Sequence, residues 1–214
     1  LQHLLASRDH SASCHIPSTA FATNFPTNHG ANSAEGTRNS PSLVNIGYHP
    51  YFTREGGVPT LEMQVLVPIQ EENEFSHNIL DIVDSLKLDL EYVQAAQEAY
   101  QSEINAFVIT RALACFERTL ISGSSLFDRF LEGDESVLTE SELSGYALFN
   151  TKGCNNCHSG DLFTNFEIVN NGLYEKYDDP GLFNLTNEES DIGKFKVASL
   201  RNVAITHPYM YDGS

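Results

Sequence analysis

The stretch Cys154-Asn155-Asn156-Cys157-His158 decides the fold of this chain. It is a C-x-x-C-H motif, and this spacing is the attachment signature of c-type haem. Two thiols three positions apart can each form a thioether with one vinyl group of a single haem, while the imidazole that follows ligates the iron. The sequence therefore predicts a covalently bound haem, with Cys154 and Cys157 as its anchors and His158 as an axial ligand.

A disulfide or half of a zinc site is the alternative interpretation, because two thiolates at this spacing also suit tetrahedral Zn²⁺. A zinc site needs two more ligands, and the chain contains no second C-x-x-C. The other Cys-His pair lies in Ser11-Ala12-Ser13-Cys14-His15, which is the same haem motif with its first Cys replaced by Ser. Taken alone, this dipeptide would indicate a packed thiol beside a surface imidazole.

Length and composition limit the classes of protein. The chain has 214 residues with 41% apolar content, which is enough for one large or two small domains. No run of 18 apolar residues is present, so no membrane-spanning helix is expected. With 12 Lys and Arg against 29 Asp and Glu, the formal charge of −17 excludes a phosphate-binding surface for nucleic acid. It favours a small cationic redox partner, or it serves only solubility.

The haem motif also predicts a location. Covalent haem attachment takes place outside the bacterial cytoplasm, and the chain does not start with a basic-then-apolar leader. We therefore expect a signal peptide that has been removed, and a periplasmic protein.

Helices are predicted at three places. Residues 1–50 are rich in turn-forming residues, which indicates loops around one short helix. A helix of about five turns is expected behind a cap at Ser102, with Cys115 as a packed thiol on its apolar face. Its apolar positions recur at three- and four-residue steps and are Ile104, Phe107, Val108, Ala112, Cys115, Phe116 and Leu120.

The third helix precedes the haem motif. Thr139 and Glu142 form a capping box that opens a helix through Gly145, Leu148 and Phe149. A Gly and an aromatic residue on one face, just ahead of C-x-x-C-H, are typical of the first helix of a cytochrome c fold. Residues 170–191 are polar and turn-rich, and residues 195–213 are expected to return the chain to the core.

Further segments carry a resemblance to a known family. They are Ile16-Pro17, Phe21, His29-Gly30, residues 36–45, Leu61-Glu62-Met63-Gln64, Pro68-Ile69, Glu117-Arg118-Thr119-Leu120, Phe195-Lys196-Val197, Ser199-Leu200-Arg201-Asn202-Val203 and residues 208–213. Together with the two haem-type motifs, these segments resemble the bacterial di-haem cytochrome c peroxidases, whose relatives include the methylamine dehydrogenase maturase.

The resemblance implies a fold. It is mainly α, with two cytochrome c-like haem domains and long loops, a peroxidatic domain at 1–130 and an electron-transfer domain at 131–214. The family's chain continues past this point, so the second domain is expected to be incomplete at its C-terminus. The resemblance also implies a Ca²⁺ between the domains, and the matching positions are Asn39, Thr206 and Pro208. Carbonyl and amide oxygens suit such a hard cation. Without the resemblance, Asn39 would simply stabilise a turn.

The resemblance also assigns the reactive residues. His15 would be the proximal ligand of the peroxidatic haem attached through Cys14, and His29 a distal ligand that is released on reduction elsewhere. Gln64 and Glu74 match the distal pair, with Glu74 as the acid/base. Judged only as residues, the acidic run around Glu74 is an ordinary solvated face and His29 an ordinary loop histidine. His158 would ligate the electron-entry haem.

Four departures from the family pattern stand out. Ser11 leaves at most one thioether on the first haem, no Trp is present to lie between the haems, and Tyr211 stands where a His is common. Residues 52–57 replace the usual aromatic-bearing segment, so the expected electron path runs through space or through Tyr or Phe side chains.

The leading prediction is reduction of hydrogen peroxide with electrons from a small periplasmic donor, a cytochrome c or a cupredoxin. A homodimer is compatible with the resemblance. A maturase-like di-haem oxidase acting on a protein side chain is the enzymatic alternative, and it differs in an axial ligand of the His158 haem that lies beyond Ser214. The non-enzymatic alternative is an electron-carrying cytochrome whose first haem site has decayed at Ser11.

Overall fold

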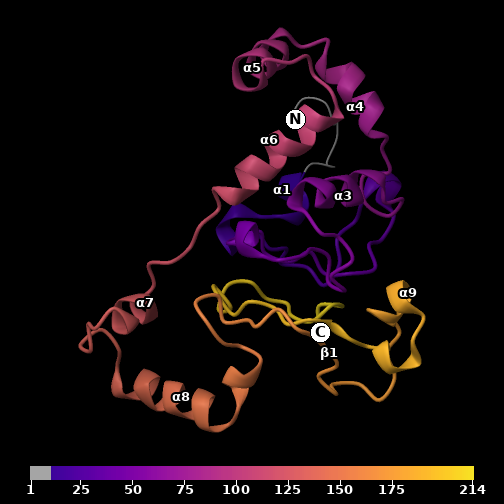
Figure 1. Ribbon diagram of the computed structural model, residues 1–214. Coiled ribbons are helices and arrows are strands. Elements are labelled where there is room, and N and C mark those ends of the chain that lie inside the picture. The colour runs from indigo at the N-terminus through magenta and orange to yellow at the C-terminus, as the bar shows by residue number, and fades with distance from the viewer. Residues whose placement is uncertain (1–10) are drawn as a thin grey trace. The chain divides into compact units, whose positions relative to one another are not determined.

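The computed structural model describes residues 11–214, apart from the side chains of Ser11 and Asn32. It is mainly helical with little sheet (Figure 1). Contacts divide it into two compact units. The first contains the residues up to Thr53, Gly57–Leu120 and Ala204–Ser214, and the second contains Arg54–Gly56 and Ile121–Val203.

This division differs from the expected boundary at residue 130. The second unit already begins at Ile121, and the C-terminal segment belongs to the first unit. One reason is a main-chain hydrogen bond, in which the N–H of Asn39 donates to the oxygen of Tyr211 at 2.8 Å. Asn39 and Tyr211 are far apart in the sequence, so no local sequence pattern indicates this contact.

Short helices build the first unit. They are α1 (Ser11–Cys14), α2 (Leu61–Gln64), α3 (Leu66–Gln70), α4 (Ile79–Leu86), α5 (Leu90–Tyr100) and α6 (Ala106–Arg118). Short 3₁₀ turns lie at Pro17–Thr19, Ala31–Ser33 and Ile46–Tyr48. A buried core gathers side chains from α3 to α6, namely Val65, Ile69, Ile79, Val83, Leu86, Ala96, Ile104, Val108 and Ile109. Its burial stabilises the unit at roughly 25 cal/mol per Å² of apolar surface.

Helix α6 is shorter than expected and buries a different face. Its cap is Asn105, whose Oδ1 accepts the N–H of Val108 at 3.0 Å, and not Ser102. The buried side is formed by Val108, Ile109, Thr110 and Ala114. Of the predicted face, Phe107 and Phe116 are more than half exposed, and Ala112 and Cys115 are exposed as well.

The physical reason lies in the neighbours of α6. Ala114 is fully buried against Ile46, Phe52 and Leu61, where its small side chain allows close packing. Apolar residues occur on more than one side of α6, so periodicity alone does not select the buried one. The exposed ring of Phe107 is covered by the guanidinium of Arg111, 3.4 Å from its centroid.

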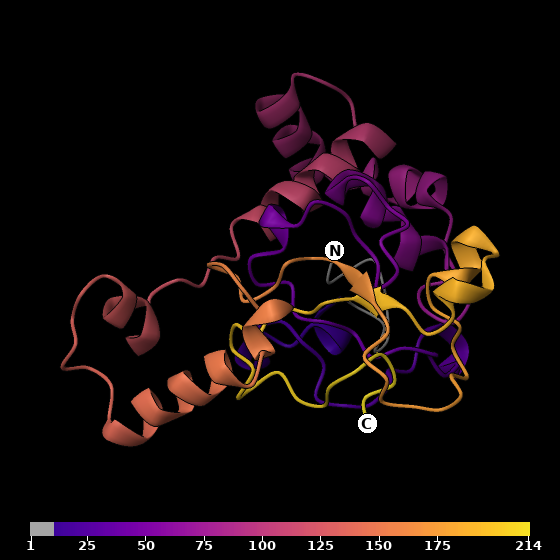
Figure 2. The ribbon, with the colours of Figure 1, turned by 60° about the horizontal axis from the view of Figure 1, so that its bottom comes forward.

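The second unit has fewer regular elements. They are α7 (Leu126–Leu131), α8 (Glu140–Thr151), a 3₁₀ turn at Cys154–Asn156, β1 (Ile168–Val169), α9 (Phe183–Thr186), a 3₁₀ turn at Glu189–Asp191 and β2 (Phe195–Lys196). Strands β1 and β2 pair antiparallel, with Ile168 opposite Lys196 and Val169 opposite Phe195 (Figure 2). Within residues 11–214, no helix combines the length and the apolar character that a membrane crossing requires.

Capping boxes start helices α7 and α8 of the second unit. At α8 the expected box is confirmed: the N–H of Thr139 donates to Glu142 at 2.7 Å, and the Glu142 N–H donates back to Thr139 Oγ1 at 3.3 Å. Helix α7 has the same arrangement between Ser125 and Asp128, which was not predicted from the sequence. An aromatic cluster joins the elements, as Phe127 of α7 lies 5.1 Å from Tyr146 of α8 and 5.4 Å from Phe163, centroid to centroid.

Candidate functional site

The C-x-x-C-H motif follows directly after helix α8. Gly153, with φ of 79°, turns the chain into the 3₁₀ turn, and the N–H of His158 donates to the oxygen of Cys154 at 2.9 Å. Left-handed φ favours glycine at this position. Cys154 is exposed and Cys157 is half-buried, and both are free thiols rather than a disulfide. The turn therefore presents two thiols and one imidazole within a single short segment.

The ring of His158 is oriented by two main-chain carbonyls. Its Nδ1 lies 3.2 Å from the oxygen of Phe163 and 3.2 Å from the oxygen of Ala198. Because carbonyl oxygens only accept, Nδ1 must carry a hydrogen, and in the neutral form of the ring Nε2 then carries the lone pair. A metal-ligating histidine usually donates its other ring N–H in this way, which fixes its tautomer and raises its basicity. The contacts of His158 therefore fit an iron ligand.

His15 is supported in the same manner in the first unit. Its Nδ1 lies 2.9 Å from the main-chain oxygen of Phe21. Burial lowers the pKa of His15, and hydrogen bonds to the main-chain oxygens of Phe21 and Pro41 partly oppose this shift. The ring is therefore neutral near pH 7, which is the form that ligates a metal. Cys14, at the end of α1, directly precedes it.

A serine in each unit holds the loop that accepts the histidine N–H. Ser42 Oγ donates to the oxygen of Ala20 at 2.6 Å, and Ser199 Oγ donates to the oxygen of Leu162 at 2.6 Å. The next residue in each loop is a phenylalanine, Phe21 in the first unit and Phe163 in the second. The main-chain oxygen of this phenylalanine accepts the hydrogen bond from the histidine. The two histidines thus share a second layer of support.

The serines open a repeated Ser-Leu-x-Asn sequence, at residues 42–45 and 199–202. In each copy the third residue donates its N–H to the serine oxygen at 3.1 Å, and the asparagine has a left-handed φ, 61° at Asn45 and 59° at Asn202. This repeat was not predicted, although both copies stand in the sequence. Comparing the residues downstream of the two Cys-His pairs would have revealed it.

The structure brings the loops of His29 and Glu74 together. The N–H of Ala31 donates to the oxygen of Glu74 at 2.5 Å. Gly30 packs directly against the main chain of Asn73 and Glu74, where a Cβ would clash. His29 itself is exposed and forms an isolated β-bridge with Glu35. The two predicted distal residues therefore lie on neighbouring loops of one unit.

Gln64 has a feature that its local surroundings do not explain. It is the last residue of α2, and its Oε1 atom is buried without a hydrogen-bond partner in residues 11–214. A buried polar atom left unpaired costs about 1–3 kcal/mol, so such atoms are rare unless they serve a ligand. Gln64 is one of the residues predicted for the distal pocket.

Glu74 has a raised pKa. Desolvation is the main cause, and the negative charge of Glu71 adds to it. The residue is exposed by surface area, although protein atoms crowd its carboxyl group enough to disfavour the charge. A carboxyl group of this kind exchanges a proton closer to neutral pH than an ordinary glutamate does.

The residues expected for Ca²⁺ all belong to the first unit. Asn39 is buried, and its Nδ2 donates to the oxygen of Phe25 at 3.1 Å. Thr206 and Pro208 are half-buried in the C-terminal segment. Within residues 11–214, no group of three or more His, Cys, Asp or Glu side chains is placed to hold a metal ion.

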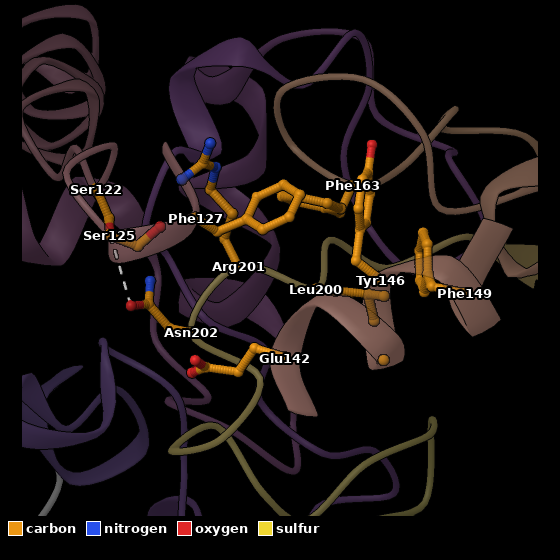
Figure 3. A pocket seen from close by; sticks show the side chains of 11 residues that line it. Ser122, Ser125, Phe127, Glu142, Tyr146, Phe149, Phe163, Leu200, Arg201 and Asn202 are labelled. Carbon is orange, nitrogen blue, oxygen red and sulfur yellow. Dashed lines mark hydrogen bonds between the residues drawn. The ribbon is translucent and has the colours of Figure 1, made fainter. Parts of the chain in front are cut away.

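A pocket of about 370 Å³ lies in the second unit, between α7, α8 and the Ser199–Asn202 segment (Figure 3). The rings of Phe127, Tyr146, Phe149 and Phe163 line one part of it, and Arg201 and Asn202 contribute polar groups. Ser122 Oγ and Asn202 Oδ1 lie 3.5 Å apart at its edge. The pocket therefore adjoins Phe163, whose carbonyl supports His158.

Comparisons with known proteins agree with this geometry. A family profile described as di-haem cytochrome c peroxidase matches residues 6–136. The cytochrome c551 peroxidase of Nitrosomonas europaea is 32% identical over 94% of this chain and 62% of its own. The methylamine utilization protein MauG of Methylorubrum extorquens is 34% identical over 94% and 58%. The chain thus spans about three fifths of the length of these relatives.

Solved structures show the same fold. A MauG-like protein associated with microbial copper homeostasis is 31% identical, with a TM-score of 0.86 over 95% of this chain and 66% of its own. The diheme peroxidase BthA of Burkholderia thailandensis is 21% identical, with a TM-score of 0.80 over 95% and 63%. The sequence profile, the relatives and the paired histidine supports agree, and the chain belongs to the di-haem cytochrome c peroxidase family.

Proposed function

We propose that this chain forms the main part of a periplasmic peroxidase that reduces hydrogen peroxide to water with electrons from a small redox protein. The reaction is H₂O₂ + 2 H⁺ + 2 e⁻ → 2 H₂O, so the protein must deliver two electrons. The observation that carries the proposal is the matched support of His15 and His158, each held through Nδ1 by a loop carbonyl. Two iron sites suit a two-electron reaction, whereas an electron carrier needs only one.

The proposal assigns one c-type haem to each unit, as two cytochrome c-like domains. Cys14 and His15 would hold the first haem, with one thioether at most because residue 11 is Ser. Cys154, Cys157 and His158 would hold the second. When bound, the haem irons supply peroxide activation at the first site and electron storage at the second. Each histidine is held with a hydrogen on Nδ1, which leaves Nε2 as the atom that would ligate the iron.

Three residues of the first unit would handle substrate and protons. Gln64 would accept a hydrogen bond from peroxide through Oε1, which satisfies its otherwise unpaired buried atom. Glu74 would take a proton from one peroxide oxygen and return it to the other, a role that its raised pKa favours. His29 would be the distal ligand that withdraws on reduction, from a loop tied to the Glu74 main chain.

The remaining assignments concern metal and partners. Ca²⁺ would bind at the Asn39 side chain and at oxygens of Thr206 and Pro208 in the C-terminal segment. A cationic donor, a cytochrome c or a cupredoxin, would be attracted by the formal charge of −17. A homodimer is compatible with the proposal.

Haem counting combined with turnover tests the proposal. The full-length protein is expected to carry two haems by pyridine haemochrome and intact mass, and to oxidise a reduced small cytochrome c when peroxide is added. One haem, bound at Cys154 and Cys157, would support the electron-carrier alternative. Two haems without donor oxidation, but with peroxide-dependent modification of a protein side chain, would support the maturase-like alternative.

A further inference from the structure

The second unit contains an ion pair that the proposed haem chemistry does not use directly. Arg201 donates to both carboxylate oxygens of Asp128, at 2.6 and 2.9 Å, and each side chain is only 12% exposed. Asp128 also accepts from the N–H and the hydroxyl of Ser125, at 2.8 and 2.7 Å. The carboxylate is therefore fixed at the start of α7, and it presents a rigid acceptor to the guanidinium.

The same guanidinium also contacts the loop that orients His158. Arg201 Nε donates to the main-chain oxygen of Asp161 at 2.6 Å, and the guanidinium lies 5.8 Å from the ring centroid of Phe163 (Figure 3). Ser199, two residues earlier, donates to the oxygen of Leu162. The three consecutive residues 161–163 are thus held from one segment, and the third supplies an oxygen to Nδ1 of His158.

The segment also acts on His158 from its other side. Ala198, which precedes Ser199, supplies the second carbonyl oxygen to Nδ1. Displacing this segment would therefore move both acceptors of the His158 N–H. In the first unit, Val44 occupies the position that corresponds to Arg201 in the repeated Ser-Leu-x-Asn sequence. The serine hydrogen bond occurs in both units, but at this position only the second unit has an ion pair, between Arg201 and Asp128.

We propose that Arg201 is a positioning residue for His158, and that its ion pair with Asp128 sets the strength of the Nδ1 hydrogen bonds. This inference rests on the proposed haem at Cys154, Cys157 and His158. Stronger hydrogen bonds from Nδ1 make a histidine a more basic ligand, which favours the oxidised metal and lowers the reduction potential. The Arg201–Asp128 pair thereby tunes the potential of the second site and leaves that of the first site alone.

A charge-neutral double variant separates positioning from electrostatics. Asp128→Asn with Arg201→Gln removes one negative and one positive charge, so the net charge is unchanged. Spectroelectrochemical titration of the full-length protein should show a more positive midpoint potential for the haem on Cys154 and Cys157, with no change for the haem on Cys14. If the potential stays at the parent value while thermal stability falls, the pair is only structural and the inference is wrong.

The same helix offers a matched control. Arg129 donates to Asp134 at 2.7 Å, but this pair is exposed and does not touch the His158 loop in the described structure. The double variant Asp134→Asn, Arg129→Gln makes the same charge change and should leave both potentials unchanged. An equal shift in this control would also contradict positioning by Arg201.

A second variant covers the case in which the first fails to fold. Arg201→Lys keeps the charge, but a single ammonium group cannot replace the planar guanidinium, which binds both oxygens of Asp128 and donates to Asp161 at the same time. It should shift the same potential in the positive direction, and a parent-like potential would overturn the inference. Haem content on the Cys154–Cys157 peptide is measured first in the parent protein. Its absence there would refute the proposed function, whereas haem with an unshifted potential refutes only the role of Arg201.

Discussion

Nδ1 of His158 lies 3.2 Å from the main-chain oxygen of Ala198, a residue 40 positions further along the chain. The contact places a hydrogen on Nδ1, so in the neutral form of the ring the lone pair is on Nε2. Together with the contact to Phe163, it holds the imidazole between two segments of the second unit. The orientation of this ring therefore depends on packing rather than on the motif that contains it.

The first haem is predicted to differ in its spectrum from the second. Ser11 offers a hydroxyl, which cannot form a thioether, so one vinyl group of the haem on Cys14 stays intact and extends the ring conjugation. The reduced α-band of this haem should lie to the red of the other band, and Ser11→Cys should merge the two. A single band of the two-thioether type, with two haems counted, would contradict attachment through one thiol.

Glu74→Gln is expected to keep both haems and lose peroxide turnover. The amide preserves the shape of the side chain but cannot take up and return a proton, and such help is worth about 10² to 10⁴ in rate. Stopped-flow or steady-state donor oxidation measures the loss. Glu72→Gln, in the same exposed acidic run, is the control and should turn over like the parent. Activity of the Glu74 variant within about threefold of the parent would remove Glu74 from the mechanism.

Removal of Ca²⁺ is expected to lower both activity and thermal stability. The proposed ligands join the buried Asn39 to the C-terminal segment, which the main-chain hydrogen bond to Tyr211 also ties to the first unit. A ligand that binds only the folded state stabilises it by mass action. Calorimetry and donor oxidation, with and without chelator, measure the effect, and added Ca²⁺ should restore both. Indifference of both measurements to chelator would exclude the metal.

Asp128→Ala is expected to destabilise the protein by about 1–3 kcal/mol. The change leaves the guanidinium of Arg201 unpaired and removes one half of the capping box with Ser125. The cost is below that of a deeply buried pair, because Asp128 lies just beneath the surface. Denaturant unfolding measures it. Asp134→Ala breaks the exposed pair with Arg129 and should change the free energy of unfolding little; equal costs would contradict this account.

Glu117 is expected to make stability depend on pH. Desolvation raises its pKa to about 7, an effect that Arg118 partly opposes. The folded protein binds a proton at Glu117 more tightly than the unfolded chain, whose glutamate pKa is 4.5. The stabilisation from this proton is complete below pH 4.5 and is lost as the pH rises to about 7. On going from pH 4.5 to pH 8, the free energy of unfolding of Glu117→Gln should therefore rise by about 1–2 kcal/mol relative to that of the parent, after allowance for solvent screening. Urea unfolding at both pH values tests this, with the exposed Glu98→Gln as control.

Signals that lie within a few residues of one another were predictable from the sequence. The C-x-x-C-H motif joins two thiols and an imidazole over five positions, and its chemistry needs no distant partner. The capping box of α8 is equally local, since Thr139 and Glu142 lie one helical turn apart and satisfy each other's N–H groups. Membership of the family followed because many such short segments occur in the right order along the chain.

Features that depend on distant partners were decided only by the tertiary structure. Helix α6 buries Ala114 rather than Phe116 because Leu61 and Phe52 pack on that side, and a period of 3.6 residues does not record which side a neighbour occupies. Arg201 meets Asp128 across 73 positions, and the carbonyl of Ala198 finds His158 across 40. The sequence by itself contained the C-x-x-C-H motif and the Cys14-His15 pair that we propose as haem sites. Packing of the folded chain decided how each histidine is aimed, because main-chain acceptors carry no side-chain signal.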